Sequence, residues 1–170
     1  MIQAMAPRLS SFISQARDAG VLIVFVQALF DEPYLSQEWA DKWTKSPSGK
    51  GLCTAGAWGT ELYLVQPQAG DVVITKHRYS AFKGTNLDLV LRSKGIQTLL
   101  ISGVSTNVCV ESTARDGHQM DYYIVLLEDC VANTDERAHS NTLENIRRHF
   151  GEVCSNADVL SAWHQVAEPA

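Results

Sequence analysis

Short runs of apolar and β-branched residues alternate along this chain with stretches that carry helical spacing. A continuous apolar run of five or six residues is typical of a strand that is covered on both faces. The predicted strands are 21–26, 71–75, 98–102 and 122–127, with a weaker one around 152–154. The predicted helices are 3–18, 85–94, 106–119, 135–149 and 156–165. This alternation constrains the fold more than any other feature of the sequence.

Strands that alternate with helices imply right-handed crossovers and a parallel sheet that has helices on both faces. The sequence therefore predicts an α/β protein with a three-layer α/β/α architecture. Its 170 residues fit one domain, residues 1–170, with a single core. The composition, 45% hydrophobic and 19% charged, is that of an ordinary globular protein.

The segment 31–61 interrupts the alternation. It is rich in glycine and proline and also holds three tryptophans, Trp39, Trp43 and Trp58. A loop of this length in a compact domain usually has a function. We interpret it as a wall of the active site or as a contact between subunits.

Composition argues against several classes of function. The net charge of -5 is mild and the basic residues are scattered, which argues against nucleic acid as a partner. The longest apolar run is far shorter than the roughly 20 residues that cross a membrane. No secretory signal pattern is visible at residues 1–8, so a cytoplasmic location is expected. Four cysteines without a CxxC pair indicate reduced thiols rather than a zinc ribbon or a disulfide framework.

Two reactive side chains follow predicted strands, where ligands bind in open parallel sheets. Lys76 comes directly after 71–75, and Cys109 lies in a predicted turn, Ser/Thr cap and first helical turn after Gly103. A helix N-terminus and a nearby ammonium group both favour the thiolate form of a cysteine. The free N–H groups of that turn could also hold an oxyanion. The alternative for Cys109 is an inert packed thiol, and for Lys76 a solvated surface charge.

Three sequence blocks carry a resemblance to a known family. GDVVITKHRYSAFKGTNLDLVLRSKGI, TLLISGVSTNVCVESTARDG and YIVLLEDC resemble the isochorismatase-like cysteine hydrolases, and within them the ureidoacrylate and N-carbamoyl-type amidohydrolases. The resemblance covers about residues 5–163 and implies a Rossmann-like fold. It implies that Cys109 is the nucleophile and Lys76 the catalytic lysine. It also implies a cis peptide bond between Val104 and Ser105 and an oxyanion hole built with Val108 and Cys109.

Further residues are candidates for substrate binding. Tyr79 and Phe82 follow Lys76 and are expected to form apolar walls, with loop packing as the alternative. Trp58 could contact substrate or anchor the loop, and Asn107 could bind substrate or hold the turn. The stretch 27–34, where metal-dependent relatives carry histidines, has none, so we expect no metal and no cofactor. The resemblance and the tryptophan-bearing segment favour a homo-oligomer.

One part of the family's pattern is missing. The resemblance implies an opening strand, between 21–26 and 98–102, that ends in an aspartate able to move protons. The sequence given starts after it. We considered three explanations: residues upstream of Met1, closure of the two flanking strands, or a strand from a partner subunit. We expect the first.

The sequence supports two main hypotheses about function. The first is hydrolysis of a C–N bond in a small amide, carbamate or ureido compound through a thioester at Cys109. The alternative is a catalytically impaired relative that acts as a binding or scaffolding subunit. A nucleotide-binding domain is a distant third, because neither GxGxxG nor GxxxxGK[ST] is present.

Overall fold

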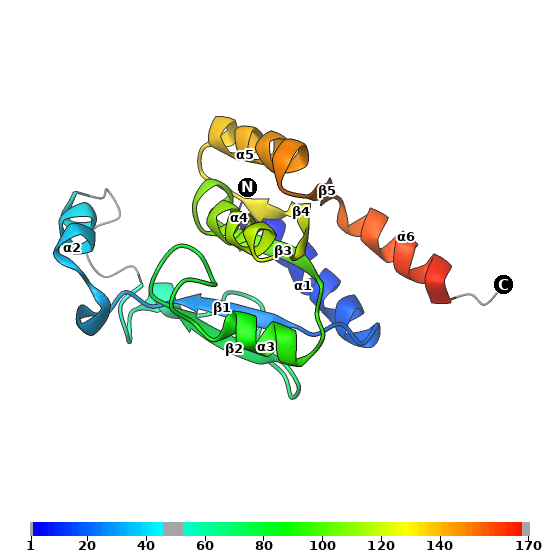
Figure 1. The fold of residues 1–170 in the computed structure, drawn as a ribbon, viewed down its shortest axis with the longest axis horizontal. Coiled ribbons are helices and arrows are strands. Elements are labelled where there is room, and N and C mark those ends of the chain that lie inside the picture. The colour runs from blue at the N-terminus through cyan, green and yellow to red at the C-terminus, as the bar shows by residue number, and fades with distance from the viewer. Residues whose placement is uncertain (1, 46–52, 168–170) are drawn as a thin grey trace.

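The computed structural model describes residues 2–45 and 53–167 and contains five parallel strands in two sheets (Figure 1). The first sheet pairs β1 with β2, and the second has the order β3-β4-β5. The strands are β1 Val24–Ala28, β2 Val72–Lys76, β3 Thr98–Val104, β4 Tyr123–Ala132 and β5 Glu152–Cys154. The parallel arrangement confirms the predicted fold class, although the strands form two sheets rather than one.

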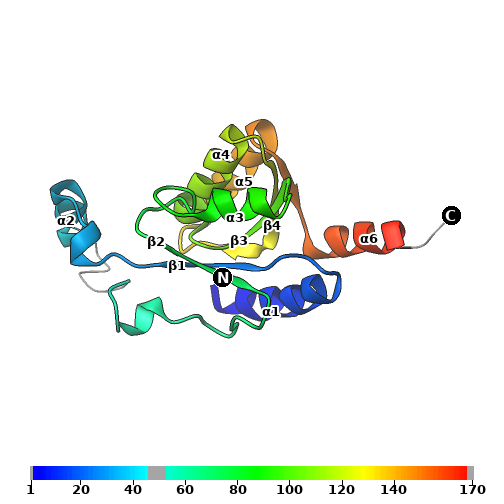
Figure 2. The same cartoon turned by 60° about the horizontal axis from the view of Figure 1, so that its bottom comes forward.

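Helices cover both faces of the strands, so the molecule has three layers (Figure 2). Helices α3, α4 and α5 lie on one side and α1 lies on the other, while α6 extends away from the body. The helices are α1 Ile2–Asp18, α2 Gln37–Thr44, α3 Leu87–Ser93, α4 Glu111–Gln119, α5 Glu136–His149 and α6 Asn156–Ala167. Two 3-10 turns, η1 Glu32–Tyr34 and η2 Trp58–Thr60, and a π-helical turn, η3 Thr106–Val110, complete the elements.

Each layer boundary has its own apolar cluster. Leu126 of β4 and Ile146 of α5 are buried in the larger cluster, which packs α3, α4 and α5 on the strands. Phe12 and Ala16 of α1 meet Leu127 of β4 in the smaller cluster on the opposite face. Adjacent residues of one strand thus point to opposite helix layers, which explains why the strands are apolar throughout.

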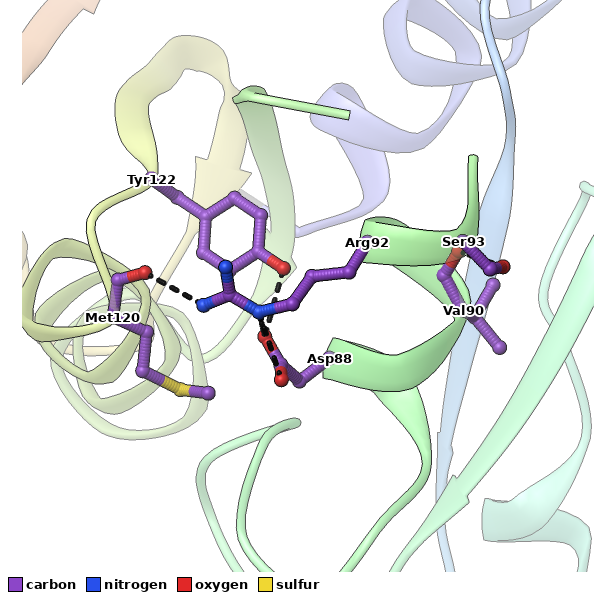
Figure 3. A network of polar contacts seen from close by, with 6 residues as sticks. All are labelled: Asp88, Val90, Arg92, Ser93, Met120 and Tyr122. Atoms are coloured by element: carbon purple, nitrogen blue, oxygen red, sulfur yellow. Dashed lines mark hydrogen bonds and ion pairs between the residues drawn. The ribbon is translucent and has the colours of Figure 1, made fainter. Parts of the chain in front are cut away.

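A polar network ties α3 to the start of β4 (Figure 3). Arg92 binds Asp88 one turn earlier through its Nε, at 2.9 Å, and donates to the carbonyl of Met120 at 3.1 Å. The buried Tyr122 donates its hydroxyl to Asp88 at 2.8 Å, and the Arg92 guanidinium lies over its ring. Burial, together with the adjacent Asp88 carboxylate, raises the pKa of Tyr122. The network fixes α3 next to the strand that follows α4.

The structure corrects several predicted boundaries. Lys76 is the last residue of β2 rather than the residue after it, and Gly103 lies inside β3. Strand β1 begins three residues later than predicted, at Val24, because residues 21–23 lead from α1 into the sheet. The stretch 31–61 is not a plain loop, since α2 and two 3-10 turns form within it. Its residues 46–52 lie outside the described residues.

The two sheets do not pair with each other, and a cavity of about 570 Å³ lies between β1 and β3. The residues that line this cavity are mostly apolar, and most of them belong to four elements. Helix α1 contributes Leu9, Phe12, Ile13 and Ala16, β1 contributes 24–26, β3 contributes 98–104, and α3 contributes Leu87 and Leu91. Closure of the flanking strands, one of the three explanations above, is therefore not what the structure shows.

Candidate active site

Cys109 lies in the π-helical turn η3, directly after β3 and before α4. The peptide bond between Val104 and Ser105 is cis, as the resemblance implied. The predicted Ser/Thr side-chain cap is wrong, because the Ser105 side chain makes no capping hydrogen bond. Instead the Ser105 carbonyl accepts from the N–H groups of Val108, at 3.1 Å, and Val110, at 3.3 Å. Single π-turns often occur at functional sites.

Side chains from two other elements hold the turn that carries Cys109. The buried Thr106 hydroxyl lies 3.0 Å from Nδ1 of His139 on α5. Asn107 is exposed, but its amide oxygen accepts from Asn133, just after β4, at 2.8 Å. Both contacts reach across more than 25 residues of sequence, so the position of the turn depends on the tertiary fold.

Lys76 brings a positive charge to the carboxyl end of the first sheet. It pairs with Ala28 across the β1–β2 register, is only 5% exposed, and donates from Nζ to the carbonyl of Tyr79. Lys76 ends β2 and Cys109 follows β3, and both residues line the cavity between the sheets. The structure thus brings together the two residues that were predicted to carry the chemistry.

An aromatic cluster borders this site. The Tyr79 and Trp39 rings lie 4.8 Å apart, and Trp39 also contacts Phe30 at 5.4 Å. The Arg78 guanidinium lies over the Trp39 ring at 4.9 Å. Burial raises the pKa of Tyr79, and the charge of Cys109 raises it further. Helix α2, within the segment 31–61, therefore packs directly against the residues next to Lys76.

Cys53 also lies near the end of β1, although no motif in the sequence distinguishes it from the other cysteines. Its carbonyl accepts from the N–H of Phe30 at 2.7 Å, and the N–H of Leu29 donates to the carbonyl of Lys76 at 2.9 Å. Burial raises the pKa of the Cys53 thiol, the charge of Cys109 raises it further, and Lys76 acts in the opposite direction. The thiol therefore lies within electrostatic range of both predicted catalytic residues.

Two of the residues predicted to bind substrate lie elsewhere. Phe82 packs into the larger core cluster, with its ring 5.7 Å from that of Tyr122. Trp58 lies on η2 and is 77% exposed. Neither is among the residues that line the cavity beside Cys109, and the other two predicted residues, Tyr79 and Asn107, are not among them either. Their contact with substrate remains a prediction.

Thr113 makes a hydrogen bond that its spacing of four residues from Cys109 could have predicted. Its hydroxyl donates to the carbonyl of Cys109 at 2.7 Å and accepts from the N–H of Ala81 at 3.0 Å. Thr113 follows Cys109 by four residues, which is the spacing at which a helical threonine bonds to the preceding turn. It joins the turn that carries Cys109 to the segment after Lys76.

The described part of the chain carries few other groups for chemistry. Among residues 2–45 and 53–167, no three His, Cys, Asp or Glu side chains gather closely enough to hold a metal ion. No helix in those ranges has the length and apolar character needed to span a membrane.

The described residues that line the cavity include neither a carboxylate nor a histidine. Among the described lining residues, a thiol and an ammonium group therefore share a mostly apolar cavity with no carboxylate or imidazole beside them.

Comparison with known proteins is consistent with this site. The isochorismatase domain family matches residues 1–158. A ureidoacrylate amidohydrolase, RutB, of Yersinia enterocolitica is 40% identical over 169 aligned positions, which cover 89% of this chain and 74% of that protein. RutB of Serratia proteamaculans is 38% identical and covers 99% of this chain and 73% of the relative.

Solved structures give the same assignment. A cysteine hydrolase from Pseudomonas syringae pv. phaseolicola superposes with a TM-score of 0.85 and 25% identity, covering 96% of this chain and 82% of that one. An N-carbamoylsarcosine amidase from Thermoplasma acidophilum superposes with a TM-score of 0.77 and 29% identity, covering 91% and 84%.

Proposed function

The chain belongs to the isochorismatase family of hydrolases, and we propose that it cleaves a C–N bond of a small amide, carbamate or ureido compound through a thioester at Cys109. The observation that carries this proposal is that Cys109 and Lys76 line the same cavity. The names of the relatives support a ureido substrate, since ureidoacrylate amidohydrolases and an N-carbamoylsarcosine amidase are among them.

In the proposed mechanism, the Cys109 thiolate attacks the carbonyl carbon of the substrate and forms a tetrahedral oxyanion. The Val108 N–H already donates to Ser105, so the N–H of Cys109 is the better candidate to hold that oxyanion. The Lys76 ammonium favours the anionic forms of both groups. Collapse of the oxyanion breaks the C–N bond and leaves a thioester, which water then hydrolyses to regenerate the thiol.

The leaving amine needs a proton, and the described cavity lining offers no carboxyl or imidazolium group to supply it. We propose that a carboxylate on an extended segment that fills the cavity between β1 and β3 takes the proton of the Cys109 thiol and then, as the carboxylic acid, delivers it to the leaving amine, as the family resemblance implies. Both strands present unpaired edges to the cavity, and buried backbone groups normally pair. A right-handed crossover through α1 would join such a segment to β1. Its carboxyl end would then face Cys109.

Three forms of the protein test the proposal with a ureido substrate: the 170-residue chain, the chain extended at its N-terminus by an apolar strand that ends in aspartate, and the same extension ending in asparagine. We expect the aspartate form to exceed the other two by about 10²- to 10⁴-fold, the usual contribution of general acid–base catalysis. In the aspartate form, Cys109→Ser should abolish turnover and Cys154→Ser should not. Equal rates in all three forms would contradict the assignment of the base. Turnover by the Cys109→Ser variant would contradict the nucleophile.

A further inference from the structure

Lys76 and Cys109 belong to different halves of the strand framework. Lys76 ends β2 in the first sheet, and Cys109 follows β3 in the second sheet. In the described part of the chain these two sheets do not pair, so no ladder of backbone hydrogen bonds sets the position of one residue relative to the other. Another contact is therefore needed to hold the two predicted catalytic residues in place relative to each other.

The hydroxyl of Thr113 on α4 makes a contact of this kind. It donates to the carbonyl of Cys109 at 2.7 Å and accepts from the backbone N–H of Ala81 at 3.0 Å. A threonine hydroxyl has one hydrogen to donate and two lone pairs, so one side chain can bind both partners. Lys76, Ala81, Cys109 and Thr113 all line the cavity between the sheets. The hydrogen-bonded bridge therefore runs along the wall of this cavity.

The Ala81 end of the bridge leads back to Lys76. Ala81 is 2% exposed, and a buried N–H normally has a partner, which Thr113 supplies. Lys76 donates from Nζ to the carbonyl of Tyr79, two residues before Ala81. The ammonium group and the Thr113 hydroxyl thus bind the same short segment, 79–81. A shift of this segment would move the carbonyl to which the ammonium group is bonded.

The other side-chain contacts of the π-helical turn η3 run in a different direction. A histidine of α5 and an asparagine after β4 hold the turn from the side of the second sheet. Among the described residues, the bond from Ala81 to Thr113 is the one hydrogen bond that joins 77–86 to 105–117. Without the Thr113 hydroxyl, the turn would stay hydrogen-bonded to the second half of the molecule but no longer to the segment beside Lys76.

We propose that Thr113 is a positioning residue that sets the place of the Lys76 ammonium group relative to the Cys109 thiol, an inference that rests on the function proposed above. Thr113 acts through the two backbone groups that it binds, and it takes no proton and forms no bond with substrate. Because a nearby cation makes a cysteine more reactive, a displaced ammonium group should slow the reaction of Cys109 with an electrophile.

The test measures how fast iodoacetamide labels Cys109 in the 170-residue protein over a range of pH values. Thr113→Val removes the hydroxyl and should slow labelling at neutral pH by about two- to tenfold, the range that corresponds to one buried hydrogen bond. Thr113→Ala loses the same hydroxyl in a smaller side chain and should slow labelling equally. Thr113→Ser keeps the hydroxyl and should label at the original rate.

Thr85→Val is the matched control. The Thr85 hydroxyl also donates to a carbonyl, that of Ala81 at 2.6 Å, and accepts from an N–H, that of Leu87 at 3.1 Å. These bonds lie within one segment and do not reach the turn that carries Cys109. Thr85→Val should therefore lower the thermal stability as Thr113→Val does but leave the rate of labelling unchanged. Equal slowing by both variants would reflect a general loosening of the fold and would overturn the proposal.

A double variant tests whether Thr113 acts through Lys76. Thr113→Val should slow labelling no further in a Lys76→Met protein, because the ammonium group is then absent. Slowing factors that multiply in the double variant would overturn the proposal, as would labelling at the original rate in either single variant. Alkylation requires no substrate turnover, so a failure of the proposed amide hydrolysis would leave this result intact. A failure of the Thr113 role would leave the comparison of the three N-terminal forms unaffected.

Discussion

The side-chain amide of Asn133 donates a 2.8 Å hydrogen bond to the amide oxygen of Asn107, two residues before Cys109. Asn133 is buried and follows β4 directly, and its own amide oxygen accepts from the N–H of Thr134 at 2.9 Å. The residue that follows β4 thereby fixes the orientation of Asn107 at the start of the turn that carries Cys109.

We expect Asn133→Ala to lower kcat by up to about tenfold in an active form of the enzyme, since a buried hydrogen bond contributes about 0.5 to 1.5 kcal/mol. KM should change less, because the lost contact positions the turn rather than the substrate. Steady-state kinetics on a ureido substrate measure both constants. Asn141→Ala, at an exposed position of α5, is the control and should leave them unchanged.

Lys76→Met should slow alkylation of Cys109 by iodoacetamide at neutral pH. The substitution removes a buried positive charge that lines the same cavity as Cys109, and a nearby cation makes a cysteine more reactive. The rate of labelling across a range of pH values measures the change. Lys83→Met removes an exposed charge and should leave the rate of labelling unchanged at every pH. Identical profiles for both variants would show that Lys76 does not act on the thiol.

Glu111 contributes a free energy of unfolding that decreases as the solution becomes acidic. Burial disfavours its carboxylate, but hydrogen bonds from Arg115, Thr142 and Asn145 outweigh burial and lower the pKa below 4.5. Glu111 therefore stabilises the folded chain fully above the ordinary carboxyl range, and this contribution is lost as the pH falls from about 4.5 through the lower folded value.

Glu111→Gln should reduce the free energy of unfolding at pH 7 by about 1 to 3 kcal/mol and flatten its fall below pH 4.5. Urea titrations at several pH values measure both effects. Glu144→Gln changes a carboxylate that is half exposed and should reproduce neither. A loss of stability that is the same at pH 3 and pH 7 would contradict the role assigned to the charge.

Substitution of two glycines beside Ile124 tests how tightly the larger apolar cluster is packed. A Cβ added at Gly151 would lie 2.2 Å from the carbonyl oxygen of Ile124, which is backbone and cannot yield easily. At Gly117 the nearest atom would be 3.0 Å away, at the end of the Ile124 side chain. We expect Gly151→Ala to destabilise the fold by about 3 kcal/mol or more and Gly117→Ala by about 1. Thermal unfolding should rank them in this order.

Much of the fold followed from the periodicity of the sequence. Each predicted strand and helix has a counterpart, because both faces of the strands are buried and the apolar runs are continuous. The helix α2 was missed because proline and glycine dominate the segment around it. The boundaries of β1 and β3 were misplaced because pairing with a neighbouring strand decides where a strand ends, and sequence pattern does not report pairing.

The continuous apolar runs also allowed part of the candidate site to be predicted, namely the positions of Lys76 and Cys109. Lys76 and Cys109 both follow apolar runs, and parallel strands bring their carboxyl ends to one edge. His139 and Asn133 were not predicted, because their contacts with the turn that carries Cys109 depend on how α5 and β4 pack. Cys53 was not distinguished from an inert thiol, since only the hydrogen bond to Phe30 places it beside β1.

The division of the strands into two sheets affects how easily the backbone hydrogen bonds of each strand open to solvent. The β1–β2 sheet is a single pair of strands, whereas β4 is bonded on both sides, by β3 and by β5. Amide protons of β1 and β2 should therefore exchange with solvent deuterium at a lower free energy of opening than those of β4. If a segment then fills the cavity between the sheets, protection of β1 and β3 should rise together, so that the slowest-exchanging unit of the protein extends across both sheets.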